Sequence, residues 1–170
     1  IQDLNGKIEA IFEEEGYPFT FSNRLFLLHT DNAGVSERDP NNGDLLWKKR
    51  LPSLITCFAA NENQVLIGLM NGEVLLVDKA GNIHNEIDTP PSRIEAVYGV
   101  SISQSGDYGA VISGIDPQIL SVYQIGGREL EKRTEYNLSF EQRGPIRLML
   151  SGLTETTYVQ DGDSIGIFPH

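Results

Sequence analysis

The stretch Asp39-Pro40-Asn41-Asn42-Gly43-Asp44-Leu45-Leu46-Trp47 places a cluster of turn-forming residues directly before an apolar segment. Asp, Asn and Gly between apolar runs are typical of a tight β-hairpin turn. Similar turns recur along the chain, at Asp3–Ile8, Val77–Ile83 and Gln124–Leu130. Their glycines stand at positions 6, 43, 81 and 127, at intervals of 37, 38 and 46 residues. The chain is therefore a series of repeated units, each containing a hairpin.

A second series of turns lies between the first, so each repeat contains several strands. These turns are Asp31–Gly34, Met70–Gly72, Gly114–Pro117 and Asp161–Asp163. Runs rich in Val, Ile, Leu, Phe and Tyr precede them at 24–30, 64–69, 108–113 and 156–160, and follow them at 35–38, 73–77, 119–124 and 164–168. No long window has a helical period, and 8–14 follows a hairpin turn, so we predict strand there as well. The sequence predicts an all-β protein.

Repeats of about 40 to 50 residues with several strands are typical of β-propeller blades. We predict about four blade equivalents of four-stranded antiparallel sheets in a single domain, 1–170. The blades are expected at 15–52, 53–90 and 91–138, with a fourth at 139–170 that ends on a third strand and is completed by 1–14. Residues 6–14 would then pair beside 164–168 and close a small ring. The alternative is an arc of a disc with six to eight blades, whose open edges would favour homo-oligomers.

The spacing of Asp39, Gly43 and Trp47 resembles the tryptophan-docking motif of quinoprotein-type (pyrroloquinoline-quinone-like, PQQ-like) propeller repeats. This resemblance implies that the tryptophan stacks between neighbouring blades. Asp78 and Gly81 keep a shorter form of the turn, with His84 in the place of the tryptophan. Separately, Ser101–Ala110 resembles the inner hairpin of tryptophan–aspartate (WD40-like) and TolB-type propellers. The structural repeat motif is therefore assigned to Asp39, Gly43, Trp47, Asp78 and Gly81.

The quinoprotein resemblance raises the question of an enzyme. Quinoprotein dehydrogenases gather quinone and calcium ligands from many blades, and none of those ligands can be transferred to four irregular repeats. His29 and Asp31 could suggest acid–base chemistry, but a hydrogen-bonded turn accounts for them better. Asp161 and Asp163 begin like a calcium loop yet lack the further carboxylates that such a site needs. Three dispersed histidines, at 29, 84 and 170, do not have zinc-ligand spacing. We predict no catalytic, cofactor or metal residue.

Composition limits the partners. A formal charge of −11 and a pI near 4.6 repel phosphate backbones, so nucleic acid is not expected. No apolar run reaches the roughly 20 residues of a membrane span. Cys57 lies in an apolar run and is expected to be a buried thiol, which leaves both a cytoplasmic and an exported, periplasmic location open.

The sequence is therefore interpreted as a non-enzymatic propeller module that acts as a protein–protein interaction scaffold, with loops on a rigid disc facing an unknown protein partner. The charged stretches 13–15 and 128–135 could form interaction rims, but solvated outer strands explain them more simply. The alternative function is a fragment of a larger propeller enzyme, or of a sugar- or ligand-binding propeller, whose active site lies in blades outside this chain.

Overall fold

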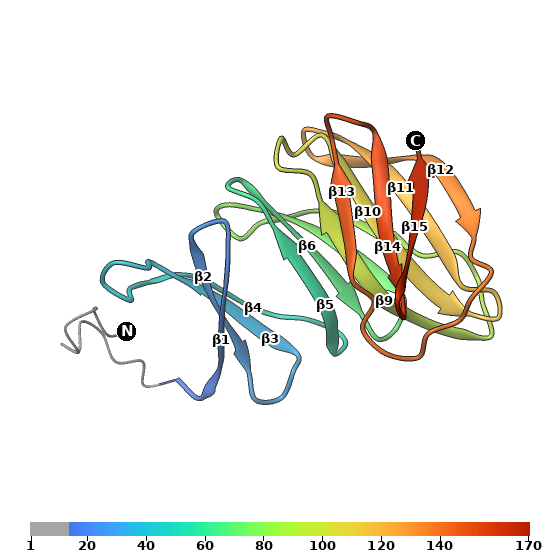
Figure 1. Ribbon diagram of the computed structural model, residues 1–170. Helices are drawn as coiled ribbons and strands as arrows, with labels where there is room; N and C mark the ends of the chain where they lie inside the picture. The colour runs from blue at the N-terminus through green and yellow to red at the C-terminus, as the bar shows by residue number, and fades with distance from the viewer. Residues whose placement is uncertain (1–13) are drawn as a thin grey trace. The chain divides into compact units, whose positions relative to one another are not determined.

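The computed structural model describes residues 14–170 and confirms an all-β chain built from propeller-type sheets (Figure 1). Within this range every sheet is a meander in which consecutive strands pair antiparallel. The chain divides into two compact units, residues 1–54 and 55–170. The single-domain boundaries, the blade limits and the closure of the ring remain predictions.

Unit 1 contains one four-stranded sheet in the order β1 (Gly16–Phe21), β2 (Arg24–His29), β3 (Gly34–Arg38) and β4 (Leu45–Arg50). The register places Phe19, Phe26, Glu37 and Trp47 side by side across all four strands. Because directly opposed residues share a face of a sheet, these four side chains lie on one face. Glu14, at the start of the described range, accepts hydrogen bonds from Lys48 and Arg38.

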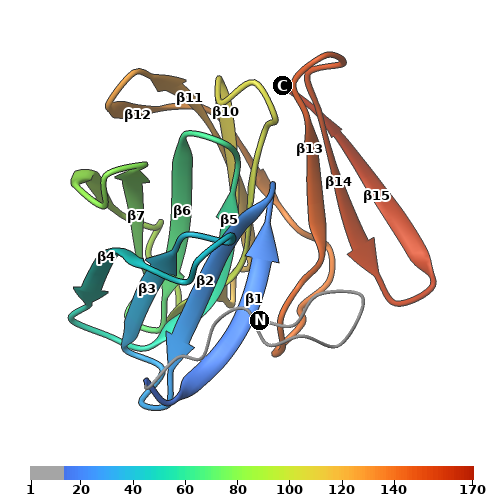
Figure 2. The same cartoon turned by 90° about the vertical axis from the view of Figure 1, so that its left-hand side faces the viewer.

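Unit 2 contains three sheets. The first is β5 (Ile55–Ala60), β6 (Gln64–Leu69), β7 (Glu73–Asp78) and β8 (Ile83–Asp88). The second is β9 (Ile94–Ile102), β10 (Tyr108–Ile115), β11 (Ile119–Gly126) and β12 (Glu129–Asn137). The third has three strands in the described range, β13 (Leu148–Ser151), β14 (Thr156–Asp161) and β15 (Ser164–Pro169). Figure 2 shows these sheets as successive layers.

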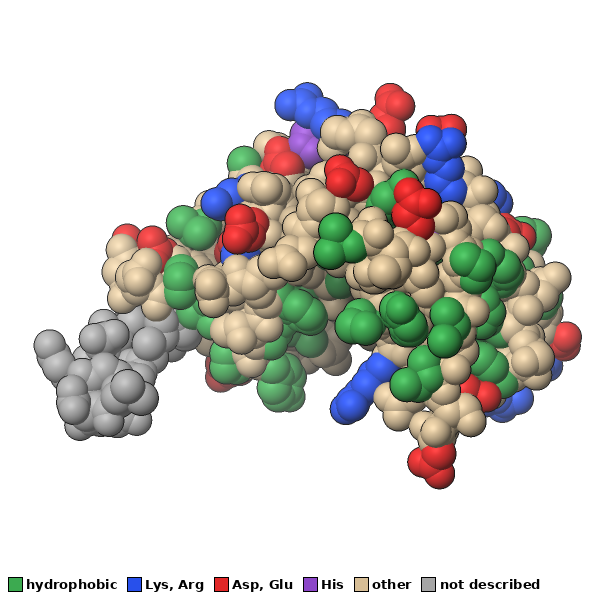
Figure 3. Space-filling view, turned by 45° about the horizontal axis from the view of Figure 1, so that its top comes forward, with side chains coloured by type: hydrophobic (Ala, Val, Ile, Leu, Met, Phe, Trp, Pro, Cys, Tyr) green, Lys and Arg blue, Asp and Glu red, His purple; other side chains and the backbone are tan. Residues whose placement is uncertain are grey.

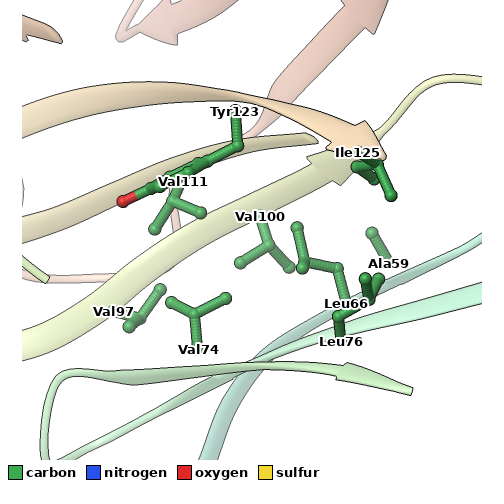
Figure 4. Packing of buried hydrophobic residues seen from close by; sticks show 9 residues of the cluster. All are labelled: Ala59, Leu66, Val74, Leu76, Val97, Val100, Val111, Tyr123 and Ile125. Carbon is green, nitrogen blue, oxygen red and sulfur yellow. The ribbon is translucent and has the colours of Figure 1, made fainter. Parts of the chain in front are cut away.

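The first two sheets of unit 2 pack face to face over an apolar core (Figure 4). Val74 and Leu76 from β7 meet Val97 from β9 and Val111 from β10, and all four are almost completely buried. Gly68 on β6 permits close approach, because a Cβ there would lie 2.5 Å from both the Cys57 Sγ and a Val97 methyl carbon. The sheets therefore approach each other more closely than a side chain at position 68 would allow.

The second and third sheets pack over another core on the opposite face of β9–β12. Ala110 and Ile112 alternate with Val111 along β10, so this strand is apolar on both faces, as a strand buried on both sides must be. Leu150 from β13 and Val159 from β14 complete this core. The sheet β9–β12 is therefore covered on both faces within unit 2.

The strands predicted around the second series of turns are all present, with bounds that differ by at most two residues. The turn glycines explain this agreement, because Gly43, Gly72, Gly81, Gly127 and Gly162 have positive φ, which glycine adopts at little steric cost. The last sheet has three strands in the described range. The strand predicted at 8–14, and its pairing with 164–168, involve residues 1–13, which lie outside the described residues.

Candidate interaction surface

The repeat motif forms the turn between β3 and β4. The Gly43 amide donates to the Asp39 carbonyl at 2.8 Å, and the Asn41 amide donates to the Asp39 carboxylate at 2.8 Å. Gly43 has a φ of 81°, which a residue with a Cβ rarely adopts. Asp39 and Gly43 thus fix the geometry of the turn.

Trp47 belongs to a buried polar cluster with Glu37 and Arg24 in unit 1. Arg24 donates two hydrogen bonds of 2.7 Å to the two carboxylate oxygens of Glu37, and the Trp47 indole donates to the same carboxylate at 2.5 Å. The side chains of Arg24 and Glu37 are 7% and 2% exposed. The Arg24 guanidinium also lies 5.0 Å from the Phe26 ring centre, a cation–π contact. The motif tryptophan is therefore held within unit 1 by a buried carboxylate.

Asp78 and Gly81 form the corresponding turn between β7 and β8. The Asp78 carboxylate accepts from the backbone amides of Ala80 and Asn82 and contacts His84 Nε2 at 2.6 Å. Burial by itself raises the pKa of Asp78, but the hydrogen bonds from Asn82, His84 and Ala80 outweigh it and hold the pKa well below its ordinary value. His84, in the place of the tryptophan, thus binds the aspartate of its own turn.

The two acid–base candidates, His29 and Asp31, lie at and after the end of β2. Asp31 accepts from the Ala33 amide at 2.9 Å and from Arg50 at 2.5 Å, and these hydrogen bonds lower its pKa. The His29 ring packs against Gly34, whose added Cβ would lie 2.3 Å from Nδ1. The contacts of Asp31 match the turn interpretation, whereas the buried Nε2 of His29 has no hydrogen-bond partner within residues 14–170.

The predicted hairpin at Asp161-Gly162-Asp163 joins β14 to β15. Gly162 has a φ of 55° at the first of the two central positions, as a type II′ turn requires. Asp161 accepts a hydrogen bond from Gln142 at 3.2 Å. Within residues 14–170, His, Cys, Asp and Glu side chains do not gather in threes that could hold a metal ion.

Cys57 lies on β5 beside the first core of unit 2 and is half-buried, not fully buried as the sequence predicts. Burial raises the pKa of its thiol to about 12, against weaker opposing hydrogen bonds. The thiol is therefore neutral at physiological pH, and a neutral thiol is a poor nucleophile.

The sheet β13–β15 carries a solvent-facing apolar surface. Register places Met149, Tyr158 and Ile167 in one row across the three strands, with Ile165 two residues along β15. Met149, Ile165 and Ile167 are 62%, 68% and 65% exposed. We call these four side chains the β13–β15 apolar face. The opposite face of the same sheet carries Leu150 and Val159 and is buried.

A groove extends this surface at the turn between β13 and β14. It has a volume of about 640 Å³, and the residues that line it include Met149, Leu153, Gln104 and Asp107. Leu153 is 99% exposed. Hydrophobic side chains gather in the lower right of Figure 3, over the region that β13–β15 occupy in Figure 1.

Sequence reasoning did not identify this face or the Arg24–Glu37 pair. The alternation of Ile165 and Ile167 with Gly166 and Phe168 predicts a strand apolar on both faces, but not which face is covered. Arg24 is the only Asp, Glu, Lys or Arg of β2, which was a usable signal for a buried ion pair, whereas β3 also carries Ser36 and Arg38 and did not single out Glu37.

These sheets define the class of the protein. The model of a family described as β-propeller protein matches residues 1–169, and the chain belongs to that family. An uncharacterized protein of Treponema pallidum (strain Nichols) is 28% identical over 154 residues, which cover 91% of this chain and 40% of that protein. The chain thus spans about two fifths of the length of this relative.

Solved structures share the fold. The computationally designed Ika4 protein matches with a TM-score of 0.69 at 14% identity, over 96% of this chain and 98% of Ika4. The β-propeller domain of Myceliophteria thermophila Cps50 (Swd1) matches with a TM-score of 0.64 at 12% identity, over 85% of this chain and 49% of that one. U3-55K matches at 0.60 and 13% identity, over 86% and 48%. At these identities the likeness concerns the fold alone. In the described residues no helix has the length and apolarity of a membrane span.

Proposed function

We propose that this chain is a non-enzymatic propeller module that serves as a protein–protein interaction scaffold. The observation that carries the proposal is the β13–β15 apolar face, where Met149, Ile165 and Ile167 are each more than half exposed on a regular sheet. Contiguous exposed apolar surface on a rigid element is typical of a protein-binding site.

The polar groups of the chain support the same proposal. Asp31, Asp78 and Glu37 hold turns and a buried ion pair, so these carboxylates have structural roles. The Cys57 thiol is kept neutral by burial. These three carboxylates and this thiol are thus committed to the fold.

The experiment is site-specific photo-crosslinking in the cell that makes the protein. A photo-reactive residue replaces Met149 on the apolar face, and a matched one replaces Leu46 on β4, which is 54% exposed. We expect a discrete crosslinked protein at position 149, absent at position 46 and lost when an excess of unlabelled chain competes. A well-folded protein that gives no crosslink at position 149, and turns over a substrate instead, would refute the scaffold and favour an enzyme.

A further inference from the structure

The turn between β6 and β7 contains the dipeptide Asn71-Gly72, a sequence that is chemically labile in water. The backbone nitrogen that follows an asparagine can attack the side-chain amide carbon and close a five-membered imide ring. A side chain on the following residue hinders this attack, and glycine has none. Within residues 14–170 the same dipeptide occurs once more, as Asn42-Gly43 in the turn between β3 and β4. The two sites differ in how firmly the structure holds the asparagine.

Asn71 is exposed, and its side chain is weakly held. Its Oδ1 accepts a hydrogen bond from the Glu73 amide at 3.4 Å, which is long for a hydrogen bond of this type. Its Nδ2 makes no hydrogen bond within the described part of the chain. The attacking amide, that of Gly72, donates to the Leu69 carbonyl at 3.2 Å. Ring closure at Asn71 therefore requires the loss of two long hydrogen bonds.

Asn42 is held by hydrogen bonds of normal length on both atoms of its side-chain amide. Its Oδ1 accepts from the Asp44 amide at 3.0 Å, and its Nδ2 donates to the Asp44 carboxylate at 2.8 Å. The attacking amide, that of Gly43, donates to the Asp39 carbonyl at 2.8 Å. Ring closure at Asn42 thus requires the loss of at least one more hydrogen bond than at Asn71. A hydrogen bond contributes about 1 kcal/mol, so its loss before reaction slows ring closure by about fivefold.

We propose that Asn71 is a site of spontaneous deamidation in the folded protein. The Gly72 nitrogen gives up its proton and forms a bond to the Asn71 Cγ, and the side-chain nitrogen leaves as ammonia. Water then opens the imide. Attack at Cγ gives aspartate, and attack at the backbone carbonyl carbon gives isoaspartate, in which the main chain runs through Cβ and Cγ. The net reaction consumes a water molecule and releases an ammonia molecule, and it needs no oxidant or reductant.

Deamidation at this position changes both the charge and the main chain of the turn. Asn71 lines a hollow of about 310 Å³ together with Asp88 and Glu95, so the new carboxylate joins two acidic side chains. Like charges close together destabilise the folded state. Isoaspartate also lengthens the main chain of a turn that the Thr89–Gly72 hydrogen bond, at 3.1 Å, ties to the end of β8. We therefore expect the reaction to loosen the β6–β7 turn.

The test is ageing of the full chain in a mildly alkaline buffer, followed by digestion and tandem mass spectrometry. The products are recognised by the change in mass from amide to carboxylate and by the separate elution of isoaspartyl peptides. In the native state we expect Asn71 to deamidate at least about fivefold faster than Asn42. In urea both dipeptides lose their hydrogen bonds, so the two rates should become similar.

Three variants separate the chemistry from the fold. Asn71→Gln keeps a side-chain amide but moves it one carbon away from the backbone nitrogen, so the reaction at position 71 should be nearly abolished. Asn42→Gln is the matched control and should leave the rate at Asn71 unchanged. Asp44→Ala removes the carboxylate that holds Asn42 Nδ2 and should raise the rate at Asn42 by about fivefold. After ageing, the parent and Asn42→Gln should unfold at a lower temperature than when fresh, whereas Asn71→Gln should not.

Two results would overturn the proposal. The first is an aged, folded chain in which Asn71 stays intact or reacts no faster than Asn42. The second is a preference for Asn71 that is equally strong in urea, because the preference would then come from the local sequence and not from the hydrogen bonds of the two turns. Neither result depends on a partner protein, so the proposed scaffold function is tested separately.

Discussion

Replacing Glu37 by alanine should strongly destabilise unit 1. The substitution removes both 2.7 Å hydrogen bonds from Arg24 and the acceptor of the Trp47 indole. Both members of the ion pair are almost fully buried, so water cannot replace the lost carboxylate. Breaking one partner of a buried ion pair costs about 3–5 kcal/mol. We therefore expect Glu37→Ala to lower the free energy of unfolding by at least about 3 kcal/mol, a large fraction of the stability of a small domain.

The assay is urea denaturation followed by fluorescence of Trp47, the only tryptophan of the chain, which reports on unit 1. Glu37→Gln keeps an acceptor for the indole and should be less damaging. The double replacement Arg24→Met with Glu37→Gln removes both charges and should be more stable than Glu37→Ala, because an apolar side chain requires no counter-charge. A loss below about 1 kcal/mol for Glu37→Ala would refute the reasoning, since that is the size expected of an exposed pair.

Three further predictions concern single positions. A hydrogen bond from Lys48, the largest of several causes, lowers the pKa of Glu14 from 4.5 to about 2. The contribution of ionised Glu14 to the free energy of unfolding is therefore fully present above about pH 4.5 and is lost as the pH falls toward 2. Glu14→Gln removes this contribution, so the free energy of unfolding measured by urea denaturation should fall less steeply with acid than in the parent. Gly81→Ala forces alanine to a φ of 83° and should cost about 1 kcal/mol in thermal unfolding, while Gly144→Ala, in open space, should be neutral. The raised pKa of Cys57, about 12, should make it react slowly with a thiol reagent at pH 8 in the native state and rapidly in urea; fast native labelling would contradict the raised pKa.

The part of the fold that depends on local chemistry could be predicted from sequence. Glycine in a turn with positive φ restricts where strands begin and end, and Gly43, Gly72 and Gly81 mark the predicted turns. Aspartate that caps its own turn is equally local, as Asp39 and Asp78 show. The repeat could therefore be found without knowing any contact between strands.

The candidate site depends on cross-strand register and on coverage, which sequence does not supply. Glu37 lies ten residues from Trp47 and becomes its hydrogen-bond acceptor only through the pairing of β3 with β4. Ile112 on β10 and Ile167 on β15 both belong to strands rich in apolar residues, yet one side chain is fully buried and the other is 65% exposed. The exposure of the two side chains differs because β10 lies in a sheet covered on both faces, whereas β15 lies in a sheet covered on one face. Which sheets are stacked depends on contacts between residues far apart in the sequence.

The solvent-facing apolar surface of β13–β15 has a physical explanation in how the sheets of unit 2 are stacked. In unit 2 the sheet β9–β12 is covered on both faces by neighbouring sheets, and its outer strand β12 is charged. It therefore exposes little apolar surface. The sheet β13–β15 is covered on one face and ends in the uncharged strand β15. Apolar side chains exposed to water on the open face of β13–β15 lack the stabilisation that burial provides. A partner protein that covered the β13–β15 apolar face would bury Met149, Ile165 and Ile167 and would recover part of that stabilisation, which is the physical basis of the proposed scaffold function.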